Sequence, residues 1–132
     1  MDIRLSHEQP RAGAVLICTD GEVDVYTALK WREYVADLVD SETVRHVGLD
    51  MSTTPFFDST GLGCLVFLFK RHRAAGGQRP GVFALVDLHK SIAKIMRITG
   101  LERVFTIVDS AEEFLALVED YEGEESKKEK CA

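Results

Sequence analysis

LDMSTTPFFDSTGLGCLVFLFKRHRAA, residues 49–75, is the stretch that decides the fold. Its apolar start continues a run that predicts a strand ending near Asp50; a polar loop follows, and helical spacing begins at the Asp-Ser-Thr-Gly sequence of residues 58–61. We expect Phe56 and Phe57 to anchor the loop to the core. A strand joined through a loop to a helix is a building unit of α/β folds.

The same alternation continues on both sides of this unit. Apolar and β-branched runs between Gly, Asp and Pro predict strands at about residues 2–6, 13–18, 44–50, 81–86 and 104–108. Most of the connections between them are too long for hairpins and carry helical spacing. We therefore expect an α/β fold with a mixed central β-sheet packed with about four α-helices.

Three helices besides the central one are predicted by apolar periodicity. The first spans residues 26–39, and the second carries Ile92 and Met96 and stops at Gly100. The last follows Ser110 and Glu113, an S-x-x-E pair in which each side chain satisfies a backbone N–H of the first turn.

Length and composition indicate one ordinary domain. The chain has 132 residues, of which 45% are hydrophobic and 29% charged, and half of it would be marginal for a core of its own. Composition changes near residue 119, where EDYEGEESKKEKCA offers almost nothing to bury. We expect a folded domain over residues 1–118 and a charged, frayed tail over residues 119–132.

Charge and hydropathy exclude several classes of partner. Sixteen Lys and Arg against twenty-two Asp and Glu leave a net charge of −6, which disfavours nucleic acid and anionic lipid. The longest stretch without polar side chains, residues 61–69, is about half the length of a membrane-spanning helix, and the N-terminus lacks a signal-peptide core. We expect a cytoplasmic protein with no nucleic-acid or membrane partner; the sequence carries no signal for an oligomeric state.

No catalytic, metal or cofactor motif is present. The cysteines and histidines are scattered without ligand spacing, so we expect neither a metal site nor a disulfide. Ser59 lacks the G-x-S-x-G elbow of a hydrolase and has no histidine near it in sequence. Gly61 and Gly63 lack the third glycine of a dinucleotide fingerprint, and there is no phosphate-binding loop. We expect no enzymatic activity and no cofactor.

Ser59, at the predicted start of the central helix, allows two interpretations. A serine there is first of all a helix N-cap, whose oxygen accepts a backbone N–H that the helix cannot satisfy. A helix N-terminus also tolerates a phosphate, because of its free N–H groups and its partial positive charge. Gly61 and Gly63 would let another protein approach the Ser59 hydroxyl closely.

Four pieces of the chain together resemble a known family. PFFDSTGLGCLVFLFKRHRAAGG, starting at Pro55, is similar to the signature of the STAS domain in bacterial anti-sigma factor antagonists of the SpoIIAA and RsbV type. The other pieces, in register, are GEVDVYTALKWRE at 21–33, VGLDMS at 47–52 and ITGLERVFTIVDSAEEFL at 98–115. The resemblance covers residues 2 to 118 and implies a single STAS domain.

The resemblance implies a regulator controlled by phosphorylation. In that family a partner that is both anti-sigma factor and serine kinase phosphorylates the serine after the Asp of the D-S-[ST]-G element, which here is Ser59. The unphosphorylated form binds this partner and frees the sigma factor, and a serine phosphatase resets the cycle. The alternative is a STAS scaffold or sensor subunit of a signalling assembly, without direct sigma-factor control.

The residues expected to bind the partner lie around Ser59. The resemblance implies a role for Asp24, which we also expect to be an N-cap of the helix near Tyr26. The expected partner-binding set is Asp24, Asp58, Ser59, Thr60, Gly61 and Leu62. The chain departs from the family by placing Phe67, Leu68 and Phe69 after the glycines, which predicts a bulkier buried face of the helix.

Overall fold

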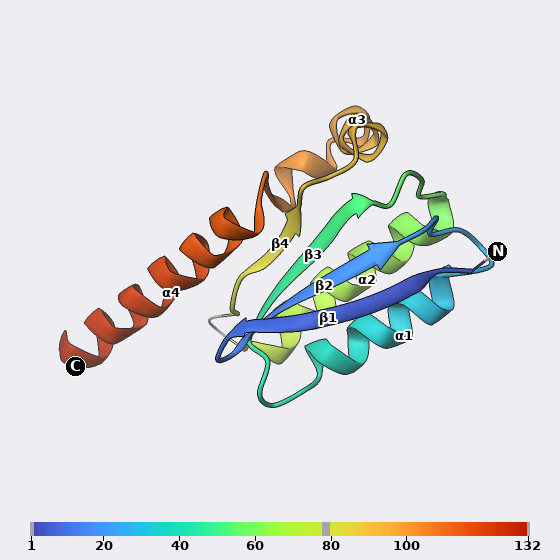
Figure 1. Cartoon of the computed structure of the whole chain (residues 1–132). Helices are drawn as coiled ribbons and strands as arrows, with labels where there is room; N and C mark the ends of the chain where they lie inside the picture. Colours follow the sequence, from blue (N-terminus) through green and yellow to red (C-terminus); the bar gives the residue numbers. More distant parts are fainter. Residues whose placement is uncertain (1, 78–79, 132) are drawn as a thin grey trace.

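The computed structural model describes residues 2–77 and 80–131, with side chains through Ser126. One sheet has its strands in the order β1 to β5. Figure 1 shows β1 to β4 side by side in this order. β1 runs antiparallel to β2, and the other neighbours are parallel. The strands are β1 (Arg4–Arg11), β2 (Ala14–Asp20), β3 (His46–Thr53), β4 (Phe83–Val86) and β5 (Thr106–Val108). The predicted α/β class with a mixed sheet is confirmed.

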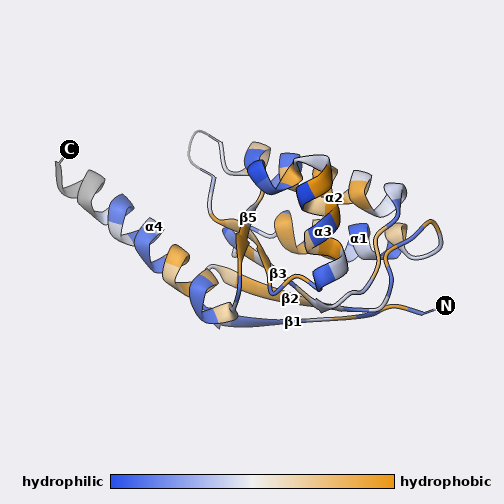
Figure 2. Ribbon diagram, turned by 90° about the horizontal axis from the view of Figure 1, so that it is seen from above, coloured by the Kyte–Doolittle hydropathy of each residue, from blue (hydrophilic) through white to orange (hydrophobic). Residues whose placement is uncertain are grey.

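Helices cover both faces of this sheet. Within the described residues they are α1 (Ala28–Val39), α2 (Ser59–Ala75), α3 (Lys90–Thr99) and α4 (Ala111–Cys131), with a short 3-10 helix at Leu101–Arg103. α1, α2 and α3 lie together on one side of the strands, and α4 extends away from them (Figure 2). The four helices predicted from the sequence are therefore all present; α1 to α3 begin and end close to the predicted positions, and α4 extends well past residue 118.

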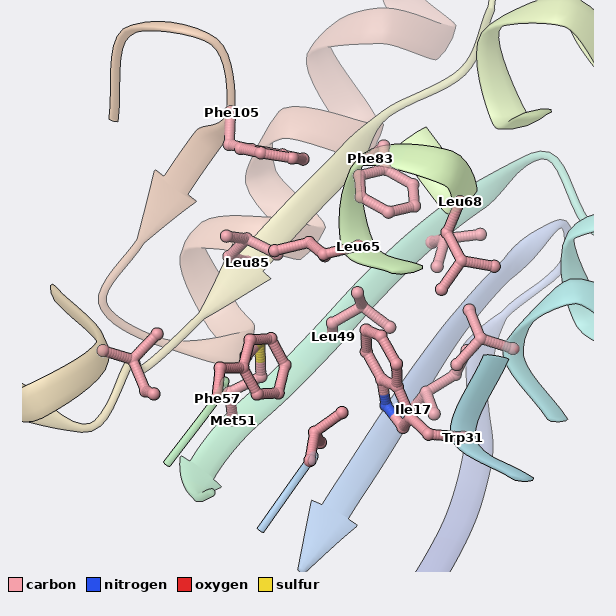
Figure 3. Close-up of a cluster of buried hydrophobic side chains, with 14 of the residues drawn as sticks. Ile17, Trp31, Leu49, Met51, Phe57, Leu65, Leu68, Phe83, Leu85 and Phe105 are labelled. Carbon is pink, nitrogen blue, oxygen red and sulfur yellow. The ribbon is translucent and has the colours of Figure 1, made fainter. Parts of the chain in front are cut away.

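Alternation along the strands separates two cores. Val47, Leu49 and Met51 of β3 face α1, α2 and α3, where they meet the buried Trp31 and Leu65 (Figure 3). The indole N–H of Trp31 donates to the Thr19 hydroxyl at 3.0 Å, so the one polar atom of this buried ring is satisfied. This face contains the larger of the two apolar clusters.

The opposite face is covered by the first half of α4. Phe114 and Val118 of α4 pack on small and apolar residues of β2 and β4. Gly48 of β3 lies beneath Phe114, and a Cβ at Gly48 would be 2.9 Å from the Phe114 ring. Because that distance is shorter than carbon atoms tolerate, glycine is what allows α4 to pack this closely on the strand.

Two helix ends follow the sequence prediction closely. α3 stops at Gly100, which has a φ of 76° and so adopts the left-handed conformation that glycine accepts without strain. At the start of α4 the Ser110 hydroxyl accepts the Glu113 N–H at 3.2 Å. The Glu113 carboxylate accepts from the Asp109 N–H at 2.8 Å, one residue earlier than the standard capping box.

Two segments differ in conformation from what the sequence suggested. α4 does not end at residue 118 but continues as a helix to Cys131, and Tyr121, Glu122 and Glu125 in its second half make hydrogen bonds to Arg45 and His46. Phe67 does not add to the buried face of α2: it is 42% exposed, with the guanidinium groups of Arg32 and Arg71 over its ring.

Candidate functional site

The carboxyl ends of β2 and β3 bring two loops together. These strands are parallel neighbours, so the segments that follow them leave the sheet at the same edge. The Val23 N–H donates to the Phe56 carbonyl at 3.0 Å, and the Asp58 N–H donates back to the Val23 carbonyl at 3.2 Å. The loop after β2 is thereby joined to the start of α2, and α2 begins beside it.

Asp58 holds both loops with one carboxylate. Its Oδ1 accepts the Gly61 N–H at 2.9 Å, and its Oδ2 accepts the Val25 N–H at 2.9 Å. Asp58 is therefore the N-cap of α2, and the expectation that Ser59 fills this position is wrong. The reason is backbone conformation: Asp58 is extended, with ψ near −175°, whereas Ser59 already belongs to the helix.

The Ser59 hydroxyl is consequently not used as the cap of α2. It is the first residue of α2, and both Ser59 and Thr60 are exposed. Within the described part of the chain, neither the Ser59 hydroxyl nor the N–H groups of Ser59 and Thr60 make a hydrogen bond. The first turn thus presents an uncommitted hydroxyl together with unpaired backbone donors, which is an arrangement that accommodates an anion.

The Asp24 side chain stabilises the turn that precedes α1. It is nearly buried, and its Oδ1 accepts the N–H groups of Tyr26 at 2.9 Å and Thr27 at 3.2 Å. These bonds close the turn before α1. α1 begins at Ala28 with Thr27 at its N-cap position, so the expectation that Asp24 is the N-cap of this helix is wrong. The carboxylate is therefore committed to holding the loop that leads to Val25 and Asp58.

The two glycines of α2 have different surroundings. Gly61 is buried, and a Cβ there would lie 2.7 Å from the Val23 carbonyl oxygen. Gly63 is exposed and would meet nothing within 4 Å. Leu62, between them, is half-buried against the larger core. Of the expected partner-binding residues, the structure thus exposes Ser59 and Thr60, half-buries Asp58 and Leu62, and uses Asp24 and Gly61 to support them.

Four exposed apolar side chains near these loops were missed from the sequence. Val25, Tyr26, Leu29 and Phe56, which we name the apolar rim, are 63%, 84%, 57% and 44% exposed. Phe56 was expected to anchor the loop, but in this extended segment only its neighbour Phe57 points inward. A signal for Leu29 was available, because the buried stripe of α1 runs through Ala28, Trp31, Val35 and Val39 and leaves Leu29 outside.

Two further properties concern the described residues as a whole. No group of three or more His, Cys, Asp or Glu among them is placed to bind a metal ion. None of the helices built from these residues combines the length and the apolar character that crossing a bilayer requires. The candidate site consists of the Ser59 hydroxyl, the backbone N–H groups of Ser59 and Thr60, and the apolar rim.

Comparisons with known proteins show which family the chain resembles. The STAS domain profile matches residues 7–114. An anti-sigma-B factor antagonist of Listeria monocytogenes is 30% identical over 107 residues, covering 81% of this chain and 90% of that protein. The anti-sigma F factor antagonist of Paenibacillus polymyxa is 24% identical over 110 residues, covering 83% of this chain and 90% of that protein.

Solved structures agree in fold. A putative anti-sigma factor antagonist of Thermotoga maritima superposes with a TM-score of 0.78 at 22% identity, over 87% of this chain and 94% of that one. SpoIIAA of Bacillus in its phosphorylated form superposes with a TM-score of 0.65 at 18% identity, over 86% and 97%. With the profile spanning most of its length, the chain belongs to the STAS domain family, and the relatives it resembles are named anti-sigma factor antagonists.

Proposed function

We propose that this protein is an anti-sigma factor antagonist that works by partner switching. Unphosphorylated, its Ser59 face binds an anti-sigma factor that is also a serine kinase, which releases the sigma factor; phosphorylated on Ser59, it dissociates, and a serine phosphatase restores it. The chain acts by binding, in the cytoplasm, with no catalysis of its own. The observation that carries the proposal is the exposed, unbonded Ser59 hydroxyl at the start of α2.

The surroundings of Ser59 support both halves of the cycle. The apolar rim offers exposed surface of the kind that anchors protein interfaces, where aromatic residues such as Tyr26 contribute disproportionately. The unpaired N–H groups of Ser59 and Thr60 can hold a phosphate without rearrangement of α2. The switch therefore needs no refolding of this domain.

Charge explains why phosphorylation would end binding. A phosphate adds roughly −1.5 to −2 charges at neutral pH, and it would be attached beside the Asp58 carboxylate on a chain of net charge −6. A like charge or a desolvated group opposite it in a closed interface costs several kcal/mol. Since about 1.4 kcal/mol is a tenfold change in affinity, a penalty of about 3 kcal/mol weakens binding roughly a hundredfold.

The test uses purified protein, a panel of candidate anti-sigma factor kinases, ATP and Mg²⁺. We expect mass spectrometry to locate one phosphate on Ser59. Ser59→Ala should bind the kinase like the wild type and accept no label, whereas Ser59→Asp should bind more weakly. Ser126→Asp, which adds the same charge to an exposed site in α4, is the matched control and should bind normally.

Two outcomes would reject the proposal. Phosphate on Thr60 instead of Ser59 would move the switch to another hydroxyl, which Thr60→Ala would verify. Binding of the panel with no phosphorylation, and equal affinity for Ser59→Ala and Ser59→Asp, would favour the alternative function, a STAS scaffold that assembles signalling proteins.

A further inference from the structure

The exposed face of α2 continues past Ser59 to an aromatic side chain. Three exposed residues follow Ser59 at intervals of four positions: Gly63, Phe67 and Arg71. Residues four apart on a helix lie next to one another on one face, so these positions form a single stripe along α2. At Gly63 a Cβ would meet nothing within 4 Å, so the stripe is open between Ser59 and the Phe67 ring. The candidate site therefore continues along α2 as far as Phe67.

Two arginines contact the Phe67 ring. The Arg32 guanidinium, from the neighbouring helix α1 (Figure 1), lies 5.1 Å from the ring centroid, and that of Arg71 lies 6.0 Å from it. Both distances fall in the range of a cation–π contact. The Asp40 carboxylate accepts two hydrogen bonds from Arg71, at 2.8 Å and 2.6 Å, and so fixes this guanidinium beside the ring. We name Phe67, Arg32 and Arg71 the aromatic–arginine cluster.

The two arginines of the cluster differ in their other partners. The charge of Arg71 is balanced by Asp40, whereas no carboxylate among the described residues pairs with Arg32. Lys70 is exposed three positions after Phe67, and it too makes no ion pair within the part of the chain that the structure describes. An arginine that lies over an aromatic ring keeps its N–H groups available for a carboxylate. Arg32 therefore offers these donors to a group from outside the chain.

From these contacts we propose that the aromatic–arginine cluster binds an acidic segment of the anti-sigma factor. The inference rests on the proposed function and adds the chemistry of the partner's surface: an apolar side chain covers the Phe67 ring, and a neighbouring Asp or Glu accepts from Arg32. Phe67 follows Ser59 by eight residues, or about 12 Å along the helix axis. One interface of ordinary size, about 800 Å² on each partner, spans both. Exposed aromatic and arginine side chains are the types that contribute most to binding at such interfaces.

Charge complementarity identifies the occupant. A cation that is removed from water in a closed interface has to be paired, and Arg32 has no carboxylate partner among the described residues. The surface that covers Arg32 must therefore supply an anionic group. Nucleic acid would supply phosphates, but the net charge of −6 repels it, and the same charge on a second copy of this chain disfavours self-association. An acidic segment on a partner protein meets the requirement locally.

Isothermal titration calorimetry tests this with the kinase of the panel that binds the wild type most tightly, with ADP in place of ATP so that no phosphate is transferred. Phe67→Ala and Arg32→Gln should each bind at least about tenfold more weakly than the wild type. Arg32→Gln should also make the Kd less dependent on salt between about 50 and 500 mM NaCl, because it removes an ion pair. Size-exclusion chromatography of the free wild type and Phe67→Ala should show the same monomer.

Arg73→Gln is the matched control. The Arg73 guanidinium also lies over an aromatic ring, 5.4 Å from the centroid of the half-buried Phe69, but about 200° around α2 from Arg71. Because it removes the same charge from the same helix on another face, Arg73→Gln should keep the wild-type Kd and salt dependence. Phe67 and Arg32 are both partly exposed, so the urea midpoints of all three variants should match that of the wild type.

The outcomes separate this inference from the proposed function. Wild-type affinity of Phe67→Ala and Arg32→Gln, with weakened binding of Ser59→Asp, would overturn the inference and leave the partner switch standing. The reverse result would reject the switch at Ser59 and support the acidic contact. A wild-type dimer that Phe67→Ala makes monomeric would assign the cluster to a second copy, and a DNA oligonucleotide that displaces the kinase would assign it to nucleic acid. Either would overturn the inference, and no binding by any kinase of the panel would reject both proposals.

Discussion

The two glycines near the start of α2 should respond in opposite ways to the same substitution. At Gly63 a methyl group enters open space on an exposed helical position. At Gly61 it meets the Val23 carbonyl oxygen at 2.7 Å and Val23 Cγ1 at 3.0 Å. Since the oxygen belongs to the backbone, the loop after β2 must move away from α2 to make room.

The magnitudes follow from these surroundings. Gly63→Ala should stabilise the protein by about 0.5–1 kcal/mol, because alanine loses less backbone entropy in a helix. Gly61→Ala gains at most the same roughly 0.5–1 kcal/mol of helix propensity. The clash of the new methyl group with Val23 costs about 1–3 kcal/mol. Moving the loop also strains the Asp58–Val23 and Val25–Asp58 hydrogen bonds, each contributing about 0.5–1.5 kcal/mol. We expect Gly61→Ala to be destabilising by about 1–3 kcal/mol in total.

Urea denaturation, followed by the fluorescence of Trp31, measures the free energy of unfolding of both variants with the same probe. The midpoint should rise for Gly63→Ala and fall for Gly61→Ala, with an unchanged slope in each case. Because both changes add one methyl group to the same helix, propensity alone predicts the same sign for the two. Stabilisation by Gly61→Ala would refute the close contact between α2 and the Val23 loop.

Two other predictions concern carboxylates. Asp58→Ala should lower the free energy of unfolding by about 1–3 kcal/mol, because it removes both the cap of α2 and the hydrogen bond to Val25. Thermal unfolding should show a lower midpoint for this variant than for the control variant Thr60→Ala. The exposed Asp40–Arg71 pair should couple by less than about 1 kcal/mol in a double-mutant cycle. Because the Arg71 hydrogen bond lowers the pKa of Asp40, this coupling should be present above the ordinary carboxyl pKa of about 4 and vanish at more acidic pH; a coupling that persists in acid would contradict the assignment.

Local patterns were enough to predict the class of fold. The strand–loop–helix unit of residues 49–75, the stop at Gly100 and the Ser110–Glu113 cap each depend on neighbours within a few positions. Period and capping chemistry act over that range, so the sequence alone determines them. The order of motifs around Ser59 was likewise sufficient to suggest the family that the comparisons then showed.

Tertiary structure alone decided which side chains do what at the site. Asp58 caps α2 and leaves the Ser59 hydroxyl unbonded because the backbone is extended at Asp58 and already helical at Ser59; the same Asp58 carboxylate also bonds Val25, which is 33 positions away. Phe56 and Phe57 have the same chemistry, and only the pairing of Phe57 with Val23 sends one inward. Glu122 was indistinguishable from the acids around it until folding placed it against His46, 76 positions earlier. Such contacts depend on which strands pair and on how the helices pack on the sheet. The local pattern of polar and apolar residues does not specify this pairing and packing.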